Sequence, residues 1–364
     1  MKRQIYLLFI IVLGFSSSFN PAYCREGKGP KNIIILIGDG MGLNDVTAEV
    51  LLNKENAFRR FRSTGFSVTC SADKLITDSA AGATALSTGY RTNNGYLAVD
   101  TLGNSLKTIL ELAHDKGLST GLVVTSTITN ATPAGFSAHV KNRAEENEIA
   151  RQLSEGNVDV AIGGGLRFFA ADEDKKNPDL VKRIQERGYR FFKSIDELTS
   201  YNDYGPYFAL LEDDNLKPAE SRDYSLADLT SCAIKNLNHN EKGFVLMVEG
   251  SQIDKGGHAK NQDKVLGEMK DFDKAVNLAL DFAQKDGSTL VLVTSDHETG
   301  GISLTGGERN YSNLKLTFVS GDHTANMVGV FSFGPGEENF RGINENYEVG
   351  RKLINSINPG YLWH

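Results

Sequence analysis

Cysteine is scarce in this chain, with three residues among 364. Only Cys70 and Cys232 lie beyond the N-terminal stretch, and two thiols are too few for the disulfide framework that holds small secreted domains together. We therefore expect a chain that is stabilised by its own hydrophobic core, with Cys70 and Cys232 as separate buried thiols. A single disulfide between them is the alternative in an oxidising compartment.

The sequence also lacks a basic run, and its 39 lysines and arginines are outnumbered by 46 aspartates and glutamates, for a formal net charge of −7. Domains that bind nucleic acid usually carry clustered basic residues with interleaved aromatic ones. This composition therefore argues against specific binding of nucleic acid. The hydrophobic content of 40% and the charged content of 23% are those of an ordinary globular protein.

The hydrophobic run near the N-terminus, residues 5–15, is too short to span a bilayer comfortably. Two basic residues precede it and a mixed tail ends at Cys24, which is the pattern of a signal peptide over residues 1–24. We expect an exported protein, periplasmic or secreted, in which residues 25–364 form a single domain. Lipid attachment at Cys24, which would hold the protein on a membrane, is the less favoured alternative because the bulky Tyr23 precedes it.

Continuous apolar runs alternate with stretches that have apolar residues at helical spacing, which is typical of buried parallel strands joined by crossover helices. The expected strands are residues 32–37, 119–124, 158–162, 243–248 and 288–294. The expected helices are residues 105–114, 145–152, 180–187, 225–237 and 264–284. The predicted fold class is α/β, a three-layer αβα sandwich around a large, mainly parallel, doubly wound sheet. Residues 193–222 lack clear periodicity and are expected to form a surface excursion.

Three of the expected strands run into residues that commonly bind metal ions. They are Asp39, Glu249 with Asp254 and His258, and Asp296 with His297, and His323 follows later in the chain. Ligands of open α/β sheets bind beyond the carboxyl ends of the strands, so we expect these side chains to meet. Mixed aspartate and histidine ligands suit zinc, whereas magnesium prefers oxygen alone. Asp254 and His258 share one face if their segment is helical, but Gly256 and Gly257 make a turn equally plausible.

Ser79 is the candidate nucleophile. It begins a run of small residues, which suits the first turn of a tightly packed helix, and a helix N-terminus offers free amide groups to a phosphate or an alkoxide. A serine that only caps this helix is the alternative. A neighbouring metal ion favours the nucleophile, because the ion itself stabilises the alkoxide without a histidine base.

Six motifs occur in order along the chain. They are Gly38-Asp39-Gly40-Met41-Gly42, Thr77-Asp78-Ser79-Ala80-Ala81, Ala131-Thr132-Pro133-Ala134 with Arg143, Val248-Glu249-Gly250 followed by Asp254 and His258, Thr294-Ser295-Asp296-His297, and His323-Thr324. Together they resemble the ordered motifs of the bacterial periplasmic alkaline phosphatases. The resemblance implies an enzyme of broad leaving-group specificity that hydrolyses phosphate monoesters through a phosphoserine at Ser79 and releases inorganic phosphate.

The resemblance also implies two zinc ions and one magnesium ion. One zinc would be held by Asp254, His258 and His323, the second by Asp39, Asp296 and His297, and magnesium by Asp39, Thr132 and Glu249. Water activated at the first zinc would then hydrolyse the phosphoserine. Arg143 would clamp the phosphate through its planar fork, with Asp78 orienting it.

Lys255 and Asn130 would further orient the substrate in this resemblance. The bacterial members carry a carboxylate at the position of Asn130, paired with a lysine at the position of Lys255. Because Asn130 removes that charge, the resemblance does not fix the magnesium affinity, the phosphate release or the pH optimum. The chain is also shorter than those members, and the segments that form their dimer contacts have no clear match in it. The resemblance therefore leaves a homodimer as an open alternative.

Other activities within the same superfamily are alternatives, namely a phosphodiesterase or a sulfatase. Sulfatases need an oxidisable Cys or Ser followed two residues later by Pro, which Ser79-Ala80-Ala81 lacks. Arg143 favours the dianionic monoester, because the third exposed oxygen gains a charged partner. A periplasmic phosphate-binding protein without turnover is the alternative outside catalysis. The expected small-molecule partners are phosphate monoesters and inorganic phosphate.

Overall fold

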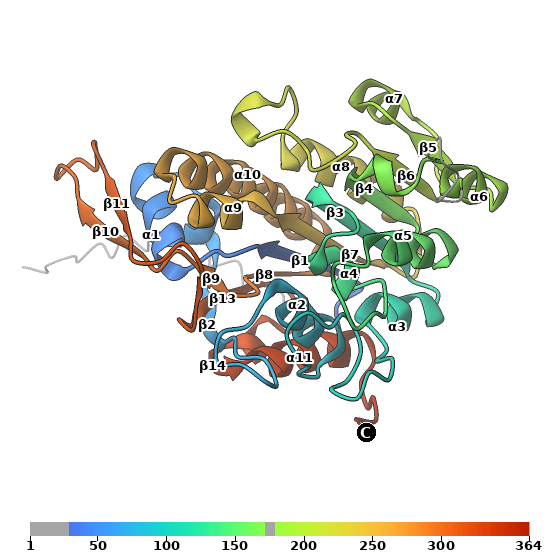
Figure 1. Ribbon diagram of the computed structural model, residues 1–364, viewed down its shortest axis with the longest axis horizontal. Coiled ribbons are helices and arrows are strands. Elements are labelled where there is room, and N and C mark those ends of the chain that lie inside the picture. Colours follow the sequence, from blue (N-terminus) through green and yellow to red (C-terminus); the bar gives the residue numbers. More distant parts are fainter. Residues whose placement is uncertain (1–28, 172–178, 364) are drawn as a thin grey trace, which may run out of the picture.

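A ten-stranded sheet forms the centre of the computed structural model, which describes residues 29–171 and 179–363 (Figure 1). In sheet order, the strands are β14 (Gly342–Glu345), β2 (Ser63–Val68), β13 (Val328–Phe333), β8 (Thr289–Thr294), β1 (Asn32–Gly38), β7 (Phe244–Gly250), β3 (Ser119–Thr127), β4 (Val160–Gly164), β6 (Tyr207–Leu210) and β5 (Arg190–Phe192). Neighbouring strands are parallel except at β13, which is antiparallel to both β2 and β8. The predicted signal peptide and Cys24 lie outside the described residues.

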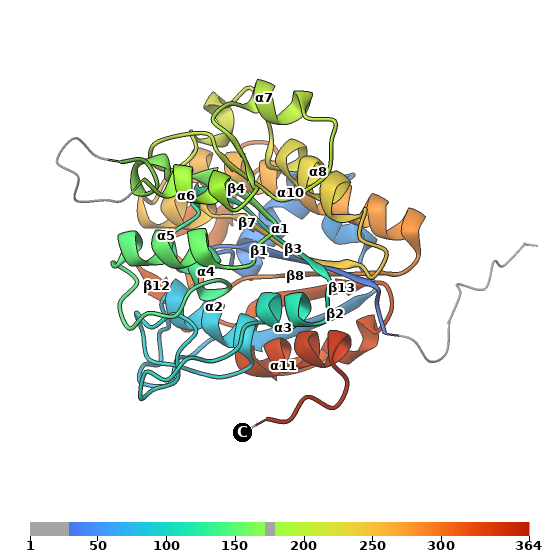
Figure 2. The ribbon, with the colours of Figure 1, turned by 90° about the vertical axis from the view of Figure 1, so that its right-hand side faces the viewer.

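Helices cover both faces of the sheet and complete three layers (Figures 1 and 2). One face packs against α1 (Leu43–Leu52), α8 (Leu226–Leu237) and α10 (Gln262–Asp286). The other packs against α2 (Ser79–Thr88), α3 (Ile109–Asp115), α5 (Glu146–Glu155), α6 (Leu180–Glu186) and α11 (Asn346–Ile357). The predicted αβα sandwich around a mainly parallel sheet is therefore confirmed.

Strand β1 shows why the central strands read as unbroken apolar runs. All of its residues are buried, and it pairs in parallel with β7 on one side and β8 on the other. Successive side chains point to opposite faces, so Ile33 and Ile35 enter one core while Ile34 and Leu36 enter the other. A strand that is covered on both faces has no polar side to show in its sequence.

Helix α2 begins and ends at clear signals. Asp78 is its N-cap and accepts a hydrogen bond from the Ala81 amide, while Gly89 ends the helix in the left-handed conformation at φ 73°. All ten of its residues are buried, because small side chains let other segments approach closely. A Cβ at Gly82 would lie 2.9 Å from the backbone oxygen of Asp296, so this glycine allows the helix to sit against the end of β8.

The main correction to the predicted elements concerns residues 193–222. They are not a plain surface excursion, because they contain α7 (Ile195–Ser200) and the buried strand β6, which joins the main sheet. Four residues are too few to display a period. The helix predicted over residues 105–114 begins only at Ile109, since Thr108 caps it by accepting a hydrogen bond from the Glu111 amide.

The thiols of Cys70 and Cys232 are free and half-buried, so the structure does not join them in the alternative disulfide. They are less enclosed than the predicted buried thiols. In the described part of the chain, no helix is both long and apolar enough to cross a membrane.

We expect Gly40→Ala to destabilise the protein more than Gly287→Ala. The two glycines share nearly the same left-handed backbone, with φ values of +71° and +70°, which costs any other residue about 1–2 kcal/mol. A Cβ at Gly287 meets nothing within 4 Å, whereas one at Gly40 would lie 2.7 Å from Thr299 Oγ1 and 2.9 Å from Asp254 Cα. The extra loss of about 1–3 kcal/mol is measurable by urea unfolding. Equal losses would contradict the close packing around Gly40.

Candidate metal centre

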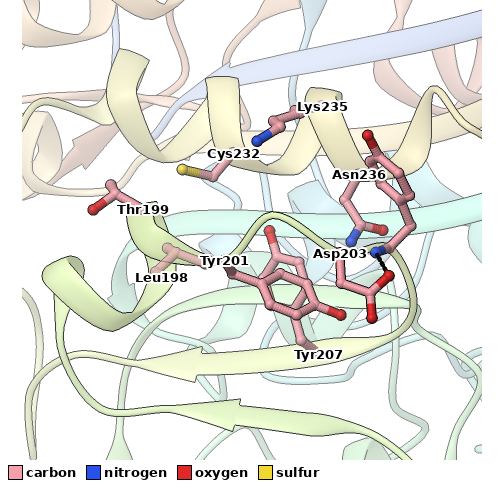
Figure 3. Close-up of a pocket in the computed structure, with 9 residues that line it drawn as sticks. Leu198, Thr199, Tyr201, Asp203, Tyr207, Cys232, Lys235 and Asn236 are labelled. Atoms are coloured by element: carbon pink, nitrogen blue, oxygen red, sulfur yellow. Dashed lines mark hydrogen bonds between the residues drawn. The ribbon is translucent and has the colours of Figure 1, made fainter.

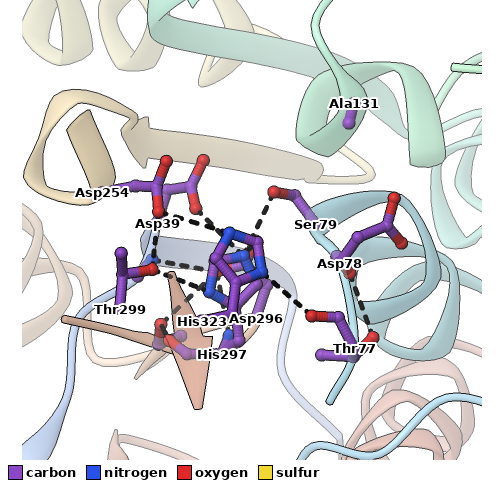
Figure 4. Close-up of polar contacts among 12 residues, drawn as sticks. Asp39, Thr77, Asp78, Ser79, Ala131, Asp254, Asp296, His297, Thr299 and His323 are labelled. Atoms are coloured by element: carbon purple, nitrogen blue, oxygen red, sulfur yellow. Dashed lines mark hydrogen bonds and ion pairs between the residues drawn. The ribbon is translucent and has the colours of Figure 1, made fainter. Parts of the chain in front are cut away.

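The carboxyl ends of three adjacent strands, β8, β1 and β7, bring the predicted ligands to one edge of the sheet (Figure 4). Asp39 follows β1, Glu249 lies near the end of β7, and Asp296 and His297 follow β8. His323 arrives from β12 (His323–Thr324), a short strand that pairs with β9 (Glu298–Thr299).

The segment that carries Asp254 and His258 is a helix, α9 (Gln252–His258), so the helical interpretation is right and the turn is wrong. Its two glycines are explained by close packing. A Cβ at Gly256 would lie 2.7 Å from Val265, and one at Gly257 would lie 2.8 Å from the Thr299 methyl group. Because residues four apart on a helix lie on one face, Asp254 and His258 project to the same side of α9.

Asp254, His258 and His323 form a first cluster. Asp254 Oδ1 lies 3.3 Å from His258 Nε2 and 3.6 Å from His323 Nε2. The two Nε2 atoms are 3.2 Å apart. Three ligand atoms thus converge on one point, at the more exposed side of the centre.

Asp39, Asp296 and His297 form a second cluster, which is buried. Their ligand atoms all lie within 4.8 Å of one another, with His297 Nε2 at 3.3 Å from Asp296 Oδ2 and 3.5 Å from Asp39 Oδ1. The rings of His297 and His323 stack with centroids 3.5 Å apart. The two clusters are therefore direct neighbours.

Two of these histidines, His258 and His323, each place their second ring nitrogen against a backbone carbonyl, which shows where a ring hydrogen lies. His258 Nδ1 lies 2.8 Å from the carbonyl of Gly321, and His323 Nδ1 lies 2.9 Å from the carbonyl of Thr77. A carbonyl can only accept, so each Nδ1 carries a hydrogen, and Nε2 is the ring nitrogen that faces the cluster. This is the arrangement in which an imidazole binds a metal ion.

Burial makes this group of acids unfavourable without a positive partner. Burial raises the pKa of Asp39 well above its ordinary value, and Asp296, Asp254 and Glu249 raise it further. Burial also raises the pKa of Glu249 to about 7 and that of Asp296 above its ordinary value. It lowers the pKa of His297 to about 3, so this imidazole is neutral.

Four buried oxygens in this region have no hydrogen-bond partner among the residues that the structure describes. They are Asp39 Oδ1, Asp296 Oδ2, Glu249 Oε1 and Thr132 Oγ1. Buried polar atoms are normally satisfied, and unpaired carboxylate oxygens are the atoms that a bound cation would satisfy. The donor set therefore fits cations: aspartate with histidine at the two clusters, as zinc prefers, and oxygen alone at Asp39, Thr132 and Glu249, as magnesium prefers.

Ser79 is the first residue of α2 and faces the second cluster. Its Oγ lies 3.2 Å from His297 Nε2, and the residue is buried. The capping alternative is wrong, because the N-cap of α2 is Asp78, whose Oδ1 accepts from the Ala81 amide at 3.0 Å. The serine hydroxyl thus stands at a helix N-terminus and beside the ligand atoms, where an oxyanion is stabilised.

Arg143 lies at the open side of the centre and is held by Asp78. Its Nη1 is 3.1 Å from Asp78 Oδ2, and its side chain is 33% exposed, so the guanidinium can reach a ligand from solvent. Sequence reasoning missed the loop that holds this pair. The Asp78 amide donates to Asn94 Oδ1, the Gly95 amide donates to Asp78 Oδ2, and the Arg143 amide donates to the carbonyl of Gly95.

Asn130 caps the helix that carries Thr132, and Lys255 lies near enough to Asp39 and Glu249 for both charges to act on its pKa. Asn130 is the N-cap of α4 (Ala131–Gly135), the short helix that also carries Thr132, and its Oδ1 accepts from the Ala131 amide at 2.7 Å. Burial lowers the pKa of the half-buried Lys255, and the neighbouring Lys264 lowers it further. Asn130 thus caps α4 and carries no charge.

A small cavity of about 40 Å³ lies elsewhere, between α7, β6 and α8 (Figure 3). Its lining includes Tyr201, Tyr207, Cys232 and Lys235. A water molecule needs at least about 10–15 Å³ of such volume, so the cavity holds only a few waters.

This chain is similar to several known proteins. The family model described as alkaline phosphatase matches residues 30–317. Alkaline phosphatase 4 of Bacillus subtilis (strain 168) is 33% identical over 417 aligned positions, which cover 91% of this chain and 89% of that protein. The alkaline phosphatase of Escherichia coli (strain K12) is 33% identical, over 88% of this chain and 85% of its own.

Solved structures give the same result. The alkaline phosphatase from the Antarctic bacterium TAB5 superimposes with a TM-score of 0.84 at 37% identity, over 90% of this chain and 98% of that one. A variant of the TAB5 enzyme, at 38% identity and the same TM-score of 0.84, has magnesium bound in its M3 site; the match covers 90% of this chain and 98% of that one.

We expect the metal-free protein to lose stability as the pH rises from about 4.5 to about 7. Burial raises the pKa of Glu249 from 4.5 to about 7 and raises that of Asp39 as well. The folded state therefore binds more protons than the unfolded state in this window, and the free energy of unfolding falls with pH. Zinc and magnesium should reverse the trend, since cations replace these protons.

Urea unfolding of EDTA-treated protein at several pH values measures this dependence, with Glu249→Gln as the matched variant. The variant keeps the side-chain shape without a titrating group, so its stability should fall less steeply across the window. Parallel curves for the two proteins would contradict the raised pKa of Glu249.

Proposed function

Because this chain belongs to the alkaline phosphatase family, and is therefore a metal-dependent phosphoric monoester hydrolase, we propose that it acts through a phosphoserine at Ser79. The single observation that carries this proposal is the position of the Ser79 hydroxyl, 3.2 Å from His297 Nε2 and at the N-terminus of α2.

The proposal assigns two zinc ions and one magnesium ion to the centre. The residues are Asp254, His258 and His323 for the first zinc, Asp39, Asp296 and His297 for the second, and Asp39, Thr132 and Glu249 for magnesium. The unpaired buried oxygens and the converging Nε2 atoms support this assignment. Bound zinc would supply a Lewis acid that lowers the cost of the serine alkoxide and of the leaving oxygen.

Arg143 binds the non-bridging oxygens of the phosphate, and Asp78 keeps its guanidinium in place. Ser79 Oγ then attacks phosphorus in line, so that the Oγ–P bond forms as the bond to the leaving alcohol breaks, and the proton lost by Ser79 ends on the departing alcohol oxygen. The free amides at the start of α2 favour the negative charge that collects there. Water attacks phosphorus from the vacated side in the second step, which breaks the Oγ–P bond and releases phosphate, and one proton of this water passes to Ser79 Oγ.

Broad leaving-group specificity is part of the same proposal. Every charged group named above acts on the phosphoryl group or on a cation, and none of them acts on the alcohol. Binding energy that is confined to the phosphoryl group discriminates little among alcohols. Phosphate monoesters as a class are therefore the proposed substrates.

Export of the protein is also proposed. Residues 1–24 have the pattern of a signal peptide, and residues 25–364 would form the catalytic domain that is released. The half-buried thiols of Cys70 and Cys232 are free, so the described fold forms without a disulfide between them.

Ser79→Ala should abolish the phosphoenzyme and lower kcat by about a thousandfold or more, because the attacking oxygen is lost. The measurement is burst labelling with a radiolabelled phosphate monoester at acidic quench. Ser87→Ala is the matched control: Ser87 lies on the same helix and donates to the carbonyl of Gly135, so its loss should leave the labelling intact. Labelling of the Ser79→Ala protein at another residue would overturn the assignment.

Arg143→Ala should lower kcat/KM for nitrophenyl phosphate by about a hundredfold or more, and should affect the methyl nitrophenyl diester much less. The dianionic monoester offers the guanidinium one more charged oxygen than the diester does. Arg151→Ala is the control, because Arg151 pairs with Glu148 at 2.6 Å on α5, away from the centre. Faster turnover of the diester than of the monoester by the unchanged protein would favour the phosphodiesterase alternative.

A further inference from the structure

Thr299 is a buried residue that lies between the two clusters of ligands. Its Oγ1 is 2.6 Å from Asp254 Oδ1 in the first cluster and 3.2 Å from His297 Nδ1 in the second (Figure 4). Only 1% of the residue is exposed, so water does not compete for either contact. Thr299 is thus a single hydroxyl that contacts one ligand of each proposed zinc ion.

The direction of both hydrogen bonds follows from the one proton of this hydroxyl. A carboxylate can only accept, so at 2.6 Å the hydroxyl donates its proton to Asp254. It then has only lone pairs left for His297, so it accepts from Nδ1, which must carry the hydrogen. The Nε2 lone pair of His297 consequently points toward Asp39 and Asp296.

His297 differs in this respect from the other two imidazoles of the centre. The Nδ1 atoms of His258 and His323 donate to backbone carbonyls, which no substitution removes. The partner of His297 is a side chain, so its tautomer depends on the identity of residue 299. A substitution at residue 299 can therefore change the tautomer and the orientation of the His297 ring.

The backbone around Thr299 fixes the hydroxyl in place. Its amide donates to the carbonyl of Gly40 at 3.0 Å, and in the β9–β12 ladder it lies directly opposite His323. Its methyl group faces Gly257, where a Cβ would lie only 2.8 Å away. Segments from β1, α9 and β12 thus hold the residue, and the hydroxyl needs no rearrangement to make both contacts.

We propose that Thr299 is a positioning residue that fixes Asp254 and His297 together and so couples the affinities of the two zinc positions. This inference rests on the proposed function, since it takes the two clusters as zinc sites. Second contacts of metal ligands typically contribute about 10- to 100-fold in affinity. Loss of the hydroxyl should therefore weaken both zinc ions, although Thr299 binds neither of them.

The test compares Thr299→Val with Thr299→Ser in the purified full chain. Valine has nearly the shape of threonine but no hydroxyl, and serine keeps the hydroxyl but loses the methyl group. Zinc affinity is measured by competition with a chelator of known affinity, in the absence of substrate. We expect Thr299→Val to bind both zinc equivalents about 10- to 100-fold more weakly and Thr299→Ser to stay within a few-fold of the unchanged protein.

Thermal unfolding in EDTA controls for a general loss of structure, because the metal-free variants should then unfold near the temperature of the unchanged protein. If Thr299→Val does not fold, Thr299→Ala against Thr299→Ser gives a second pair that differs by one oxygen. Unchanged zinc affinity in Thr299→Val, weakening of one zinc only, or equal weakening in Thr299→Ser would each overturn the role of the hydroxyl.

These outcomes differ from a failure of the proposed function. An unchanged protein that binds no zinc, or that forms no phosphoserine, would refute the zinc enzyme itself. Equal zinc binding by the unchanged protein and by Thr299→Val would refute only the positioning role of Thr299.

Discussion

The crowding of buried carboxylates at one edge of a parallel sheet is the constraint on which the rest of this structure depends. Asp39, Glu249 and Asp296 stand at the ends of three adjacent strands, and each has a pKa that burial raises. Like charges in a medium of low polarity repel strongly, so the group needs either protons or cations. Metal ions can replace these protons, so bound cations are the second way to make the folded state favourable.

Close packing of small residues is what allows this crowding. Gly82 brings α2 against the end of β8, Gly257 brings α9 against Thr299, and Gly40 turns the chain after β1 in the narrow space between Thr299 and Asp254. A side chain at any of these positions would push apart two segments that form the centre. The glycines therefore set the distances between ligands, while the hydrogen-bonded strands set their order along the edge.

The sequence predicts best the long buried strands and the features that depend on residues close together in the chain. The five apolar runs became strands because each is covered on both faces, and Ser79 could be selected because a run of small residues follows it. Strand β2 was missed because its residues alternate between buried and exposed and include Ser, Thr and Gly. Thr299 and Asn94 were missed for another reason: their partners Asp254 and Asp78 lie far away in the chain, and neither residue type carries a signal of its own.

The two sides of the centre differ in solvent exposure, and this difference changes the strength of the electrostatic interactions on each side. The side chain of His297 is fully buried and that of Asp39 is 6% exposed, whereas Arg143 is 33% exposed and Asp78 is 20% exposed. Interactions on the buried side are strong because little solvent screens them, and those at Arg143 are weaker for the opposite reason. In the proposed mechanism the buried side therefore stabilises charge at the reacting oxygen. In the proposed mechanism the exposed side binds the phosphate, where solvent weakens each charged interaction.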